Sequence, residues 1–154
     1  MESTLYRFRL EHSDETKFSG LLALKPREDG MWSVLLDATG IPLVKMLVQA
    51  DGTKQIEYCA TALRDTKLPE LLGKLVEYIY FTPAKVDCPW YALSRVCIET
   101  EDQKQSIKWK KWGPIRLWEV KQTTPSALQE KITVHMNLSS ISVQLLRIDT
   151  ETDK

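Results

Sequence analysis

The sequence has no long apolar stretch and no excess of charge of either sign. Apolar side chains never run for the ~20 positions that a membrane-spanning helix needs. Lys+Arg and Asp+Glu both number 21, so the formal net charge is zero. A protein that binds nucleic acid normally carries a basic excess, because neutralisation of phosphates dominates its affinity. The composition therefore predicts a water-soluble protein without a nucleic-acid partner.

Cysteine and histidine are also scarce. Cys59, Cys88 and Cys97 form no C-x-x-C pair, and His12 and His135 lie far from them in the sequence, so the spacing does not favour a zinc site. An odd number of cysteines leaves at least one free thiol, and the simplest interpretation is that all are small, buried apolar side chains. We expect no metal and no cofactor.

Motifs of common enzyme classes are missing as well. The sequence contains neither a G-x-S-x-G nucleophile elbow nor a G-x-x-x-x-G-K-[ST] phosphate loop. His135 lies opposite the apolar face of an alternating segment, and no nucleophile or orienting group can be assigned to it. An exposed strand histidine is therefore favoured over a general base. These absences predict a protein that is not an enzyme.

Alternation of polar and apolar residues predicts strands on both sides of one helix. The expected strands are Tyr6–Leu10, Thr16–Lys25, Met31–Asp37, Ile41–Gln49, Lys54–Cys59, Leu93–Glu99, Gln105–Lys111, Ile115–Lys121, Lys131–Asn137 and Ile141–Ile148. In the middle, apolar residues spaced by three and four from Leu68 to Ile79 predict an amphipathic helix of about 14 residues. We expect Thr66 to cap this helix, Gly73 to lie on its surface, and Pro26–Gly30 to form a charged turn.

The order of these elements predicts one domain over residues 1–154, with no parallel β-α-β repeat. A sheet of ten antiparallel strands cannot stay flat, because strand twist accumulates. We therefore expect a mainly β fold with one or few helices. Its core is a curled antiparallel sheet, an unclosed half-barrel of about 10–11 strands, with the central helix packed on its concave face.

One segment combines tryptophan with positive charge. Residues 107–118 hold three tryptophans and four cations. The favoured interpretation is a hairpin with Trp118 in the core and its lysines facing water. Docking on an anionic bilayer through Trp109, Lys110, Lys111 and Trp112 is a second interpretation, and single-stranded nucleic acid is a third. In each case we expect Trp112, beside Gly113-Pro114, to be more exposed than Trp32.

Short strand motifs resemble a known family. They are Phe18-Ser19-Gly20-Leu21-Leu22-Ala23-Leu24-Lys25, a strand reaching Trp32–Asp37, and Gly40-Ile41-Pro42-Leu43 before a fourth strand. They resemble the LolA/LolB-like lipoprotein carriers and, more narrowly, small outer-membrane lipoproteins of Bacteroidetes-type bacteria. The resemblance runs from about Tyr6 to Phe81 and more loosely to Ile148. It implies an unclosed barrel of about eleven strands covered by helices, with an apolar cavity that receives acyl chains. It also implies a lipidated cysteine that follows a signal peptide.

Residues and resemblance together predict a non-enzymatic protein of the bacterial cell envelope that binds or carries lipid or lipoprotein acyl chains. The alternative is an envelope protein-interaction subunit with a filled core and no ligand. The first residues contain no apolar leader, so the chain is either cytoplasmic or lacks its leader; we expect the second case. The expected protein is then a periplasmic monomer that is anchored as an outer-membrane lipoprotein and contacts the membrane surface.

Strand parity and the helix stripe predict which side chains line the cavity. They are Leu22, Leu24, Trp32, Val34, Leu36, Val44, Met46, Ile56, Leu71, Leu72, Leu75, Ile79, Trp118, Val120, Val134 and Met136.

Overall fold

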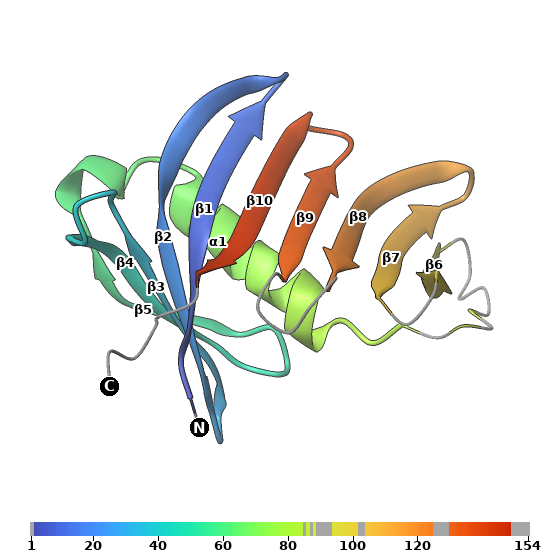
Figure 1. The fold of residues 1–154 in the computed structure, drawn as a ribbon, viewed down its shortest axis with the longest axis horizontal. Coiled ribbons are helices and arrows are strands. Elements are labelled where there is room, and N and C mark those ends of the chain that lie inside the picture. Colours follow the sequence, from blue (N-terminus) through green and yellow to red (C-terminus); the bar gives the residue numbers. More distant parts are fainter. Residues whose placement is uncertain are drawn as a thin grey trace. The chain divides into compact units, whose positions relative to one another are not determined.

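The structure, a computed structural model, describes residues 2–84, 86, 88, 94–101, 104–124 and 130–148. Strands dominate it, and one helical segment lies in the middle of the chain (Figure 1). The elements are β1 (Thr4–His12), β2 (Glu15–Arg27), β3 (Gly30–Leu36), β4 (Pro42–Val48), β5 (Lys54–Cys59), η1 (Thr61–Leu63), α1 (Leu68–Val76), η2 (Glu77–Phe81), β6 (Ser94–Glu101), β7 (Gln105–Trp112), β8 (Ile115–Thr123), β9 (Lys131–Met136) and β10 (Ile141–Ile148). Leu93, expected to begin a strand, lies outside the described residues.

The strands form one unclosed antiparallel sheet. Their order is β5-β4-β3-β2-β1-β10-β9-β8-β7-β6, so each strand lies beside a neighbour in sequence except where β1 meets β10. Strands β5 and β6 are the two ends of the sheet. The predicted mainly β class, with ten antiparallel strands and a central helical segment, is confirmed.

The chain divides into two compact units. The first comprises residues 1–8, 19–82 and 148–154, and the second comprises residues 9–18 and 83–147. The first contains β3, β4, β5 and α1, and the second contains β6, β7, β8 and β9. That residues 1–154 act as a single domain stays a prediction.

The core of the first unit follows from the strand register. Leu22 of β2 lies opposite Leu35 of β3, and Leu35 lies opposite Val44 of β4; all three are fully buried. Residues directly opposite each other on neighbouring strands share one face of a sheet. Helix α1 packs against β4 and buries its predicted apolar stripe, including Leu72.

The predicted inward face of β3 was wrong. Trp32, Val34 and Leu36 were expected on the same face as Leu22 and Val44, but the register places them on the opposite face, where they are half-buried. The guanidinium of Arg27 covers the Trp32 ring on that side, with its carbon 4.4 Å from the ring centroid. The reason for the error is that both faces of β3 are apolar except at Ser33, so parity alone favoured the face without the serine.

Ser33 lies in the core with its hydroxyl unpaired. Its side chain is fully buried between Leu24 and Met46, and Oγ has no hydrogen-bond partner among the described residues. An unsatisfied buried polar group destabilises a protein by about 1–3 kcal/mol. We therefore expect Ser33→Ala to raise the free energy of unfolding, seen as a higher urea midpoint at unchanged slope. Ser19→Ala, at an exposed position, is the matched control; a destabilised Ser33→Ala variant would contradict the unpaired state.

The helical segment begins at Leu68 and has the expected length, but its N-cap and its last turns differ from the prediction. Nine residues of α-helix run directly into five residues of π-helix. Lys67 holds the N-cap position. The Thr66 hydroxyl donates to the Leu63 carbonyl at 2.7 Å and accepts a long hydrogen bond from the Leu68 N–H, at 3.4 Å. Gly73 is buried rather than on the surface, because the Lys54 side chain crosses it: a Cβ there would lie 2.8 Å from Lys54 Cε.

The expected turn at Pro26–Gly30 is shorter than predicted, since Pro26 and Arg27 still pair in β2.

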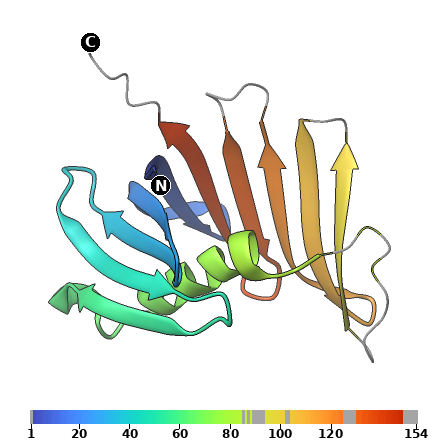
Figure 2. The same cartoon turned by 90° about the horizontal axis from the view of Figure 1, so that it is seen from below.

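The second unit has its own core row. Val120 of β8, Val134 of β9 and Val143 of β10 lie directly opposite one another, and all are buried. Trp118 lies opposite Met136 on the same face. Figure 2 shows these strands side by side.

Candidate ligand groove

A groove opens in the first unit where the end strand β5 meets the start of α1. Its volume is about 430 Å³, within the roughly 300–1,000 Å³ typical of small-molecule sites. The lining residues are Met46, Lys54, Ile56, Cys59, Arg64, Thr66, Pro69 and Glu70. The groove arises because β5 is the end strand among the described residues, while the chain turns away through η1 before the helix begins.

The floor and one wall of the groove are apolar. Met46 lies opposite Ile56 across β4 and β5, so both point to the same face. Met46 is fully buried, whereas Ile56 on the end strand is 53% exposed. An apolar side chain left half in water beside a buried methionine is a surface that an apolar ligand would cover favourably.

Charged side chains surround the apolar floor of the groove. Lys54 Nζ lies 3.0 Å from Glu77 Oε2, and Lys74 Nζ lies 3.2 Å from Glu70 Oε1, so these carboxylates are paired. Arg64 donates one hydrogen bond from Nε to the Cys59 carbonyl, at 3.4 Å. A guanidinium has five N–H donors, and Arg64 uses one of them in hydrogen bonds to the residues that the structure describes.

Cys59 is the free thiol of the chain and lines the groove. Its Sγ donates to the Ala60 carbonyl at 3.6 Å, and the residue is half-buried. Because Cys59 lines the groove, the reactivity of its thiol toward a bulky reagent reports whether the groove is occupied.

Most predicted cavity residues do not line this groove. Of that set, the groove contains Met46 and Ile56. Besides Met46, the buried members are Leu22, Leu24, Val44, Leu71, Leu72, Leu75, Trp118, Val120 and Val134. Ile79 and Met136 are half-buried. The buried side chains are packed against protein in this structure, so they form core rather than an accessible cavity wall.

Sequence reasoning missed the polar groove residues Lys54, Cys59, Arg64, Thr66 and Glu70. Each occupies an ordinary position in a strand, a connection or a first helical turn. The available signal was the change from strand to helix spacing after Cys59, which marks the place where a sheet edge and a helix end meet.

The tryptophan-rich segment forms the β7–β8 hairpin of the second unit. Trp118 is buried as expected, but the lysines do not face water together: Lys110 lies opposite Trp118 on the core-forming face. Lys108 shares that face, and burial lowers the pKa of its ammonium group.

The tryptophans of this segment differ in exposure. Trp109 is buried at 6% exposure, so its prediction as a membrane-docking residue was wrong. Trp112 is exposed and Trp32 half-buried, which confirms their predicted order.

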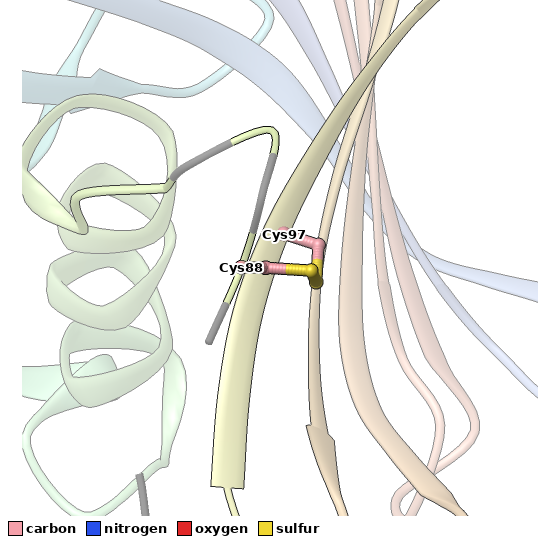
Figure 3. Close-up of a disulfide and its surroundings, with 2 residues drawn as sticks. All are labelled: Cys88 and Cys97. Atoms are coloured by element: carbon pink, nitrogen blue, oxygen red, sulfur yellow. A yellow bond between two sulfur atoms is a disulfide. The ribbon is translucent and has the colours of Figure 1, made fainter. Parts of the chain in front are cut away.

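A disulfide joins Cys88 to Cys97 (Figure 3). Cys97 lies in β6 directly opposite Trp109 of β7, and both are buried. Cys97 is buried as expected, and the structure adds that it is paired with Cys88 while Cys59 keeps the free thiol. The two cysteines are separated by nine positions, a spacing that corresponds to no motif and gave no sequence signal.

Comparisons with known proteins do not place the chain in a family: no family model matches it, and no curated protein matches it. In the part of the chain that the structure describes, no helix is long and apolar enough to cross a membrane. The same residues contain no cluster of three or more His, Cys, Asp or Glu side chains suited to a metal ion. The groove, the paired charges around it and the free thiol are thus the features on which a function can be argued.

Proposed function

We propose that this protein binds acyl chains of lipids or lipoproteins in the groove between β5 and the start of α1, as a non-enzymatic carrier of the bacterial cell envelope. The observation that carries the proposal is the groove itself, with buried Met46 below and half-exposed Ile56 beside it. The resemblance of the strand motifs to LolA/LolB-like carriers supports the same ligand class.

The Cys88–Cys97 bridge supports the proposed location in the periplasm. Disulfides persist in oxidising compartments, including the bacterial periplasm, and are rare in the reducing cytosol. Anchoring as an outer-membrane lipoprotein is part of the same proposal and rests on the resemblance.

Titration of lipid-stripped protein with a fluorescent acyl probe tests the proposal. We expect saturable binding, with affinity rising roughly fourfold for each added methylene until the groove is full, since each buried methylene contributes about 0.8 kcal/mol. Absence of saturable binding to the wild type would overturn the proposal.

Replacing Ile56 with aspartate should weaken probe binding by roughly tenfold or more, because it places a carboxylate in the apolar wall. Ile56 is half-exposed, so the fold should persist. Tyr58→Asp is the matched control: Tyr58 lies on the same strand and is 47% exposed, but it points to the other face, opposite Lys45. Equal loss in both variants would contradict the groove as the binding site.

Cys59 gives an independent measurement. Saturating acyl probe should slow the reaction of Cys59 with a bulky maleimide in the wild type, and should protect it much less in Ile56→Asp. An unchanged labelling rate in the presence of bound probe would place the probe elsewhere.

The second candidate is a protein-interaction subunit. It is favoured by β5, a terminal strand with exposed Ile56 and Tyr58 that could accept a partner strand through its free backbone edge. This candidate predicts no acyl binding, and the probe titration therefore separates the two.

A further inference from the structure

Three cations lie in a row across neighbouring strands of the second unit. Arg95 of β6 lies opposite Lys111 of β7, and Lys111 lies opposite Arg116 of β8. Like charges directly opposite each other destabilise a sheet. We call Arg95, Lys111 and Arg116 the cation row. A negatively charged surface close to Lys111 would reduce this repulsion.

The buried Trp109 ring fixes where these charges lie. The distances to its centroid are 4.9 Å for Lys111 Nζ, 5.1 Å for Arg116 Cζ and 5.4 Å for Arg95 Cζ. Ring contacts of this kind orient a cation without neutralising its charge. Arg116 also pairs with Glu119 at 3.4 Å, whereas Lys111 has no salt bridge among the described residues.

Exposed apolar side chains occupy the same end of these strands. Trp112 and Ile115 lie opposite each other around the Gly113-Pro114 turn, with 51% and 44% of their surfaces exposed. Leu138, in the turn after β9, is 76% exposed. We call Trp112, Ile115 and Leu138 the apolar tip.

Hydrogen bonds hold the two turns together. The Asn137 N–H donates to the Leu117 carbonyl and its Nδ2 donates to the Arg116 carbonyl, both at 3.1 Å. Figure 2 shows the β7–β8 and β9–β10 turns at the same end of the strands. Leu138 therefore lies at the same end as Trp112 and Ile115 and next to the cation row.

The apolar tip and the cation row lie next to each other, as the apolar interface and the charged headgroups do at a membrane surface. Lys111 adjoins Trp112 and Arg116 adjoins Ile115, about 3.3 Å along the strand, with the cations on one face of the hairpin and the two tip side chains on the other. Tryptophan favours the membrane interface, and Lys or Arg near an anionic leaflet gains attraction to its headgroups. An exposed Ile and Leu gain nothing from stacking on bases, which disfavours nucleic acid as the partner.

We propose that this end of the second unit docks on an anionic lipid bilayer, with the apolar tip in the interface and Lys111 and Arg116 on the lipid phosphates. The proposal is independent of the acyl groove, which lies in the other unit and is tested with a soluble probe. Its apolar contacts are Trp112, Ile115 and Leu138, and the buried Trp109, which was among the predicted docking residues, is not one of them.

Flotation of the full chain with lipid vesicles tests the docking. We expect binding to vesicles of phosphatidylcholine mixed with phosphatidylglycerol, weaker binding as salt is raised, and a blue shift of tryptophan emission. The double variant Trp112→Ser, Ile115→Ser should bind roughly tenfold or more weakly. Lys111→Gln and Arg116→Gln should each lose about fivefold on anionic vesicles and nothing on phosphatidylcholine alone.

Ile41→Ser is the matched control, because Ile41 is another exposed isoleucine, in a turn of the other unit. It should bind as the wild type does, and circular dichroism should show all variants folded. Equal binding to neutral and anionic vesicles, or an unaltered affinity of the Trp112→Ser, Ile115→Ser variant, would overturn the proposal. So would tight binding to a single-stranded oligonucleotide without binding to vesicles.

Discussion

Leu35→Asp should unfold most of this protein's first unit, whereas Leu36→Asp should leave it folded. Leu35 is fully buried between Leu22 and Val44, while the next residue, Leu36, points to the other face and is half-buried. A carboxylate at position 35 must lose its hydration or force the strands apart. We expect a loss of roughly 5 kcal/mol, comparable to the total stability of many domains, against about 1–2 kcal/mol for Leu36→Asp.

Urea unfolding followed by far-ultraviolet circular dichroism measures this difference. Because Leu35→Asp is expected not to fold, Leu35→Ala and Leu36→Ala provide a milder pair, with expected losses of about 2–5 and about 1 kcal/mol. If the two members of either pair lose equal stability, the face assignment of β3 is incorrect.

Strand β3 also shows how far the sequence alone could lead. The positions of the strands and of the helix followed from spacing, because alternation and a three-four repeat are local properties of the chain. The inward face of β3 did not follow, since Trp32, Val34 and Leu36 compete with Met31 and Leu35, and Ser33 interrupts the second set. Only pairing with β2 and β4 decides between them, and pairing depends on residues distant in sequence.

The candidate sites were harder to predict for the same reason. The groove needs Lys54 and Ile56 from a strand to meet Thr66 and Pro69 from a helix start, which no local pattern encodes. In the tryptophan-rich segment, composition identified the right hairpin but could not tell which tryptophan is covered. Trp109 is buried, and Arg95, Lys111 and Arg116 lie near its ring from three strands, an arrangement that depends on strand pairing.

Reduction of the Cys88–Cys97 bridge should lower the free energy of unfolding by about 2–3 kcal/mol. The two cysteines are nine positions apart, and closing a loop of that length removes this much chain entropy from the unfolded state. The loss should fall on the second unit, which contains both cysteines. Urea unfolding with and without reductant measures it, and the double variant Cys88→Ala, Cys97→Ala should reproduce the reduced value.

Thiol counting and a local optical signal check the assignment independently. Denatured, unreduced protein should take up one alkylating group, at Cys59, and reduced protein three. Cys59→Ser should leave the reductant effect on stability unchanged, since its thiol is free. Because Cys97 lies opposite Trp109, reduction should also change the near-ultraviolet circular dichroism of the buried tryptophan. Three reactive thiols in protein isolated without reductant would contradict the bridge and remove its support for an oxidising compartment.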